Sequence, residues 1–77
     1  MRVTILGCGN WGSTFGILLD QKGHKVTIWE FDAARAERVG KTRNNEPFLV
    51  GLSIPESITI TSRLNQAIAN AEVCAFA

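Results

Sequence analysis

A glycine-rich hexapeptide near the start of the chain has the spacing of a phosphate-binding turn. Gly7, Gly9 and Gly12 form the pattern G-x-G-x-x-G directly after a β-branched run. The first glycine permits a tight turn, the second lets the backbone approach a pyrophosphate, and the third allows close packing of helix on strand. The N–H groups of Asn10 and Trp11 would point out of the following helix, whose dipole favours an anion. We therefore predict a dinucleotide site here, although a turn without any ligand can have the same pattern.

An acidic residue further along could bind the ribose of the same ligand. Glu30 lies 18 positions after Gly12, close to the ~20 expected for a residue that accepts from ribose hydroxyls. A carboxylate there would also repel the 2′-phosphate of NADP. The alternatives are that Glu30 is a solvated residue at a strand end, and that Arg35 on the next, locally basic helix turns toward a 2′-phosphate. We expect NAD as the cofactor, with NADP as the alternative.

The elements that must position these residues alternate along the sequence. Strands are expected at residues 2–6, 25–30, 58–61 and 72–77, and helices at residues 11–21, 33–43 and 63–70. Asn10, Asp32 and Ser62 are the expected N-caps of the three helices. Right-handed crossovers between parallel strands predict an α/β fold of Rossmann type, the first half of a doubly wound parallel sheet. The β-α-β-α-β-α-β succession gives the strand order 3-2-1-4.

A connection between the second helix and the third strand breaks this alternation. Residues 44–57 contain an Asn-Asn pair, Pro47, Gly51 and Pro55, which predict a long irregular segment. Loops of this length inside compact domains are usually functional. We therefore expect the connection to contribute to function.

Composition excludes several classes of protein. The 77 residues are 45% hydrophobic and 19% charged, with a formal net charge of +1. A chain this apolar is not expected to be disordered, and its near-neutral charge predicts no nucleic-acid partner. No run approaches the ~18 apolar residues needed to span a bilayer, so no membrane partner is expected. Cys8 and Cys74 are too few and too far apart for a disulfide scaffold or a metal site. Cys8 is interpreted as a small filler between two glycines, and Cys74 as a core residue of its strand. We expect a cytoplasmic protein with no metal.

The length is about half that of an ordinary domain. The last expected strand is apolar enough to be buried on both faces. If the chain stopped there, Val73, Ala75 and Phe76 would lie on an unpaired, aggregation-prone edge. We therefore expect residues 1–77 to be the N-terminal part of a dinucleotide-binding domain in a longer protein.

Longer stretches of the sequence match a known family pattern. GCGNWGS surrounds the glycine turn, and GHKVTIW follows the first expected helix. The segment R-x-N-x-x-[FY]-L-P-G is matched at Arg43, Asn45, Phe48, Leu49 and Gly51. In these features the chain resembles the N-terminus of NAD(P)-dependent glycerol-3-phosphate dehydrogenases over essentially its whole length.

The resemblance implies a reaction and a set of cofactor-binding positions. The family reversibly reduces dihydroxyacetone phosphate to sn-glycerol 3-phosphate, and a Lys of a C-terminal helical domain exchanges the proton. Phe31 stands where many members have an adenosine-contacting Arg, and Val50 replaces the usual Pro of the loop. The expected cofactor-binding residues are Gly7, Gly9, Asn10, Trp11, Gly12, Glu30, Phe31 and Phe48. No catalytic residue is expected within the segment, so residues 1–77 alone are expected to have no dehydrogenase activity.

Partners and alternatives follow from the same resemblance. The full-length protein is expected to bind a dinucleotide and a small phosphorylated substrate, and to form a homodimer. Another Rossmann dehydrogenase, acting on hydroxy acids or sugar acids, would share the glycine turn but not the segment at residues 43–51. A regulatory module that binds a dinucleotide without catalysis is the remaining alternative.

Overall fold

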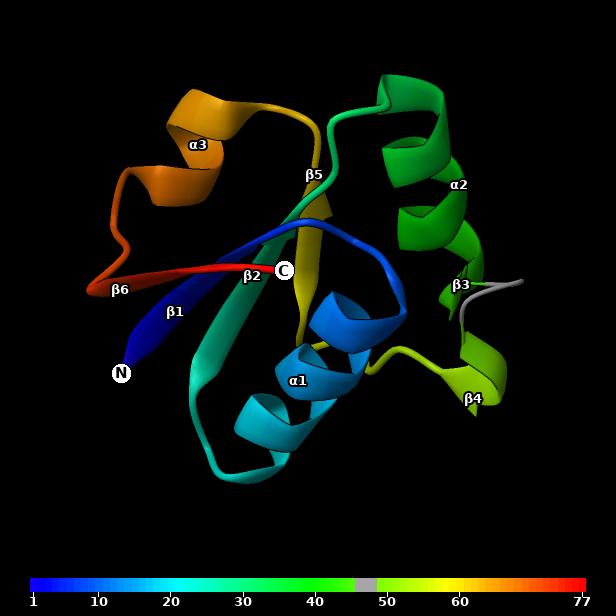
Figure 1. The fold of residues 1–77 in the computed structure, drawn as a ribbon, viewed down its shortest axis with the longest axis horizontal. Coiled ribbons are helices and arrows are strands. Elements are labelled where there is room, and N and C mark those ends of the chain that lie inside the picture. Colours follow the sequence, from blue (N-terminus) through cyan, green and yellow to red (C-terminus); the bar gives the residue numbers. More distant parts are fainter. Residues whose placement is uncertain (46–48) are drawn as a thin grey trace.

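The computed structural model, which describes residues 1–45 and 49–77, is built on a four-stranded parallel sheet (Figure 1). Its strands are β1 (Arg2–Leu6), β2 (Lys25–Trp29), β5 (Thr59–Thr61) and β6 (Val73–Phe76). They are arranged in the order β5-β2-β1-β6, and each neighbouring pair is parallel. The predicted order 3-2-1-4 of a Rossmann-type sheet is therefore confirmed.

Helices cover both faces of this sheet. Helices α1 (Asn10–Gln21) and α2 (Ala33–Thr42) lie on one side, and the short α3 (Leu64–Ile68) lies on the other (Figure 1). Side chains alternate along β1 accordingly: Val3 and Ile5 belong to the core cluster, whereas the buried Thr4 hydroxyl donates to the carbonyl of Ala67 in α3. The connections are those of a doubly wound fold, which brings the carboxyl ends of the strands to one edge.

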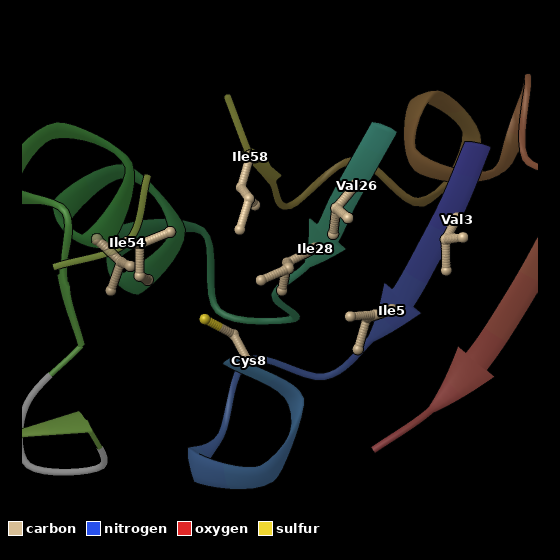
Figure 2. Packing of buried hydrophobic residues seen from close by; sticks show 8 residues of the cluster. Val3, Ile5, Cys8, Val26, Ile28, Ile54 and Ile58 are labelled. Atoms are coloured by element: carbon tan, nitrogen blue, oxygen red, sulfur yellow. The ribbon is translucent and has the colours of Figure 1, made fainter. Parts of the chain in front are cut away.

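The main core lies between the sheet and its α1/α2 side. Figure 2 shows side chains of β1, β2 and the segments near Ile54 and Ile58 facing one another, with the Cys8 sulfur directed among them. Gly16 lets α1 approach closely, because a Cβ at this position would lie 3.2 Å from Cδ1 of both Ile5 and Ile28. This close packing holds the middle of α1 against the side chains of β1 and β2.

Two of the three predicted N-caps are wrong. Asp32 does cap α2, accepting from the N–H of Arg35 at 3.2 Å. Asn10 is instead the first residue of α1, because the extended residue before the helix is Gly9, and no side chain among the described residues caps this end. The N-cap of α3 is Arg63 rather than Ser62, and this helix is also shorter than expected.

The connection at residues 44–57 is more regular than predicted. It contains β3 (Asn44–Asn45) and β4 (Leu49–Ser53), which pair antiparallel with a register shift between the two asparagines. The last strand lies at an unpaired edge of the described sheet, as the sequence predicts for residues 1–77 alone, and Cys74, predicted to be a core residue, is exposed. In the described residues β6 pairs with β1 on one side, and Val73 and Phe76 are 44% and 83% exposed.

Candidate functional site

The glycine turn lies where β1 passes into α1, at the carboxyl edge of the sheet. Gly7 has a φ of +133°, a conformation that L side chains rarely adopt. A Cβ on Gly12 would lie 2.4 Å from the carbonyl oxygen of Gly7, so only glycine allows helix and strand to approach this closely. The predicted conformational roles of Gly7 and Gly12 are confirmed by this geometry.

Gly9 differs from these two glycines because its side-chain position is open. Its φ of −95° and ψ of −165° are accessible to any residue, and a Cβ built there meets nothing within 4 Å. The backbone of Gly9 can therefore be approached from outside. The fold itself does not require a glycine at this position, so its small size leaves room for a ligand.

The first turn of α1 adds favourable electrostatics beside Gly9. The first N–H groups of a helix have no partner within the helix, and the dipole places a partial positive charge there. No described side chain caps this end, and the first turn carries no acidic residue. The N–H groups of Asn10 and Trp11 can thus serve an anion, and the residues of the turn fit a pyrophosphate.

Two exposed aromatic rings follow the carboxyl ends of neighbouring strands. Trp11 is 60% exposed and stacks on Phe15, with ring centroids 5.0 Å apart. Phe31 is 83% exposed and meets the ring of Trp29 edge-on at 6.3 Å. These rings offer apolar surfaces on which a planar base or nicotinamide could stack.

The Glu30 carboxylate comes at the end of β2, as predicted, and it is not simply solvated. Its side chain is 14% exposed. One oxygen, Oε1, lies 3.3 Å from Nε of Arg35, and the other, Oε2, accepts from the N–H of Asp32 at 2.8 Å. These contacts fix the carboxylate, and each oxygen keeps a lone pair for a further donor such as a ribose hydroxyl.

A polar cluster beneath the turn was not predicted from the sequence. Arg35 donates through Nη2 to the carbonyl of Cys8 at 2.9 Å and to Oδ1 of Asn45. Asn45 is fully buried and donates through Nδ2 to the same Cys8 carbonyl at 3.2 Å and to the Ser13 hydroxyl at 2.6 Å. The backbone between the first two glycines is therefore held from below by two side chains. In the sequence, the only feature that pointed to this cluster was the match of Asn45 to the R-x-N segment.

Arg43, in the same matched segment, binds the residues of the connection that lead into β5. It ends α2 in the left-handed conformation, with φ of 58°. Its Nη1 donates to the carbonyls of Pro55 and Ile58. Its Nε lies 2.7 Å from Oε2 of Glu56 but forms no hydrogen bond, so this contact is an ion pair alone. Arg43 thus holds residues 55–58, while Asn45 holds the turn.

The Cys8 thiol is part of the core rather than of an exposed site. It is 3% exposed, and Sγ lies 3.9 Å from the Ser13 hydroxyl. Burial raises the pKa of the Cys8 thiol above its ordinary value of 9.0. The thiol therefore stays protonated near neutral pH, in agreement with its interpretation as a filler.

Phe48 lies outside the described residues, so its predicted place near a cofactor stays a prediction. Among residues 1–45 and 49–77, no group of three or more His, Cys, Asp or Glu side chains could hold a metal ion. In the same ranges no helix has the length and apolar character needed to cross a membrane.

The whole segment matches one family model. Residues 2–77 match the model described as NAD-dependent glycerol-3-phosphate dehydrogenase N-terminus. The chain belongs to this family. Curated relatives named glycerol-3-phosphate dehydrogenase, with NAD(P)+ in the name, include those of Thermoanaerobacter sp. (strain X514), 36% identical, and Fusobacterium nucleatum, 35% identical. Both alignments cover all of this chain and 23% of the relative, so the segment spans about a quarter of their length.

Solved structures of similar proteins share the fold. The crystal structure of glycerol-3-phosphate dehydrogenase from Coxiella burnetii has a TM-score of 0.90 at 23% identity, covering 97% of this chain and 23% of that one. The glycerol-3-phosphate dehydrogenase of Plasmodium falciparum gives 0.83 at 22% identity, covering 99% of this chain and 24% of that one. At this level of identity the likeness supports the Rossmann-type fold.

Proposed function

We propose that this segment binds NAD or NADP in a protein that reduces dihydroxyacetone phosphate to sn-glycerol 3-phosphate. The observation that carries the proposal is the open backbone of Gly9 beside the uncapped start of α1. In a chain of this family, that geometry supports a pyrophosphate site. Another Rossmann dehydrogenase would share this turn, but the family match extends over residues 2–77.

Each proposed contact has a distinct physical role. The backbone at Gly9, Asn10 and Trp11 would bind the pyrophosphate, with the dipole of α1 supplying the attraction. Glu30 would accept from the hydroxyls of the adenine ribose, which its contacts with Arg35 and Asp32 leave it able to do. Phe31, and by resemblance Phe48, would contact the cofactor through their rings. When bound, the nicotinamide cofactor supplies the hydride.

The remaining parts of the proposed activity lie with the longer protein. We assign residues 1–77 to the N-terminal part of its dinucleotide-binding domain, and the catalytic Lys and the phosphate-binding groups for the substrate to a C-terminal helical domain. Lys22 ends α1, Lys25 begins β2 and Lys41 lies in α2, so none of them is assigned to proton transfer. The intact protein is proposed to be a cytoplasmic homodimer.

The proposal is tested with the intact protein by following NADH or NADPH absorbance on addition of dihydroxyacetone phosphate. We expect oxidation of the cofactor that depends on this substrate, with glycerol 3-phosphate as the product. Cofactor binding without turnover would favour the regulatory module instead. Turnover of a hydroxy acid or sugar acid in place of dihydroxyacetone phosphate would contradict the proposed substrate.

A further inference from the structure

The carboxylate that would meet the adenine ribose is paired with a cation. Nε of Arg35 lies 3.3 Å from Oε1 of Glu30, and the two side chains are only 16% and 14% exposed. An ion pair with so little solvent around it is screened less than one at the surface. Any ligand group arriving at Glu30 therefore meets a pair with almost no net charge, and not an isolated anion.

We propose that Arg35 is a specificity-determining residue that admits both NAD and NADP by neutralising Glu30. The inference rests on the proposed function, because it concerns the same ribose site. An unpaired carboxylate would repel the dianionic 2′-phosphate of NADP while still accepting from the 2′-hydroxyl of NAD. With Arg35 in place, the carboxylate keeps its hydrogen-bonding capacity but loses most of this repulsion.

The position of Arg35 is fixed by contacts beyond Glu30. Its backbone N–H donates to the capping carboxylate of Asp32, and its Nη2 donates to the Cys8 carbonyl and to Asn45. A guanidinium can use its planar set of donors in this way, whereas a lysine ammonium is a flexible point charge. Arg35 is thus held beside Glu30 by the turn itself, rather than turning out toward solvent to meet a phosphate.

Removing the two charges of the pair one after the other distinguishes neutralisation of Glu30 from direct contact between Arg35 and the 2′-phosphate. Arg35→Met keeps an unbranched apolar stem but removes the charge, leaving Glu30 unpaired. Glu30→Gln in the same chain removes the remaining charge. If Arg35 acts by neutralising Glu30, the double variant regains NADPH binding; if Arg35 contacts the 2′-phosphate, it does not.

The experiment measures dissociation constants of NADH and NADPH for the intact protein by calorimetric titration without substrate. We expect Arg35→Met to weaken the binding of NADPH relative to that of NADH by about tenfold or more, since the unpaired Glu30 carboxylate repels the 2′-phosphate at short range. Arg35→Met/Glu30→Gln should restore the ratio of the two dissociation constants to within about threefold of the wild type, because the pair is then neutral again. Binding of NADH and NADPH to the wild-type protein is measured first. If neither cofactor binds, the proposed function fails, and this result is distinct from a failure of the role proposed for Arg35.

Two further variants keep the outcome interpretable. Arg35→Lys retains the positive charge but not the planar donors of the guanidinium. Its ratio of NADPH to NADH dissociation constants should therefore stay near that of the wild type, even if both affinities fall. Arg38→Met removes the same charge from an exposed position of α2 and should leave the ratio unchanged. An unchanged ratio in Arg35→Met, or a double variant that still discriminates against NADPH, would overturn the proposal.

Discussion

At the scale of single residues, the three glycines of the turn serve two different purposes. Gly7 and Gly12 are required by the backbone, one for its positive φ and the other because the Gly7 carbonyl lies where its Cβ would be. Gly9 meets neither constraint, because its side-chain position is open and its φ is ordinary. Stability and binding can therefore be tested separately at neighbouring glycines.

Gly12→Ala should destabilise the first strand–helix unit by about 3 kcal/mol or more, because the added methyl meets backbone that cannot easily move. Gly40→Ala is the matched control. It lies within α2, its Cβ would meet nothing within 4 Å, and alanine favours the helix by about 0.5–1 kcal/mol. Hydrogen exchange of amides in β1, α1 and α2 of the intact protein measures both effects. Equal protection in Gly12→Ala and wild type would contradict the close-packing role.

The buried Cys8 thiol gives a prediction for alkaline pH. Its pKa is raised by burial, so the folded state favours the neutral thiol more than the unfolded state does. This contribution is fully present below the unfolded value near 9.0 and is lost as pH rises through the higher folded pKa. The stability advantage of wild type over Cys8→Ala should be constant at lower pH and shrink above about pH 9. Urea unfolding measures the difference in unfolding free energy between wild type and Cys8→Ala. If this difference grew with pH, the folded state would favour the thiolate, contrary to the prediction.

The sequence identified the glycines and Glu30 but missed the side chains that support them. Glycine spacing reports on local backbone geometry, which is why the turn could be predicted from a six-residue pattern. The contacts of Arg35 and Asn45 with the Cys8 carbonyl join residues 27 and 37 positions apart and depend on the final packing. An asparagine next to another asparagine indicates a turn, and nothing in that local pattern predicts its full burial.

At the scale of elements, hydrophobic pattern predicted the parallel strands and the two longer helices well. The second sheet was missed because Asn44–Asn45 contains neither β-branched nor aromatic residues, and its pairing with β4 is irregular. Cap residues were predicted correctly only at Asp32. At α1 the residue before the helix is the extended Gly9, which has no side chain that could cap it.

Asp32 gives a test at this scale. Asp32→Ala should destabilise α2 by about 1 kcal/mol, because the N–H of Arg35 loses its acceptor. Asp32→Asn should retain most of the stability, since asparagine caps helices about as well. Hydrogen exchange in the first turn of α2 measures the difference. An equal loss in both variants would mean that the aspartate charge, and not the cap, is responsible.

At the scale of the whole molecule, the described residues form a four-stranded parallel sheet, and the features of the proposed cofactor site lie at its carboxyl edge. The turn after β1 and the acid after β2 lie at the carboxyl ends of adjacent strands, where doubly wound folds bind ligands. Apolar side chains of α3 and β6, among them Leu64 and Val73, are exposed in this segment.

The central claim is that a dinucleotide binds against the bare backbone at Gly9, and Gly9→Val tests it most directly. Because the side-chain position is open and the φ ordinary, the variant should fold with an unchanged Tm. Its isopropyl group would occupy the approach to the N–H groups of α1, so the dissociation constant for NADH should rise about 100-fold or more, the loss of several charge-assisted hydrogen bonds. Calorimetric titration of the intact protein, with Gly40→Ala as the control, measures this constant. A folded Gly9→Val protein that binds NADH as tightly as the wild type would contradict the account.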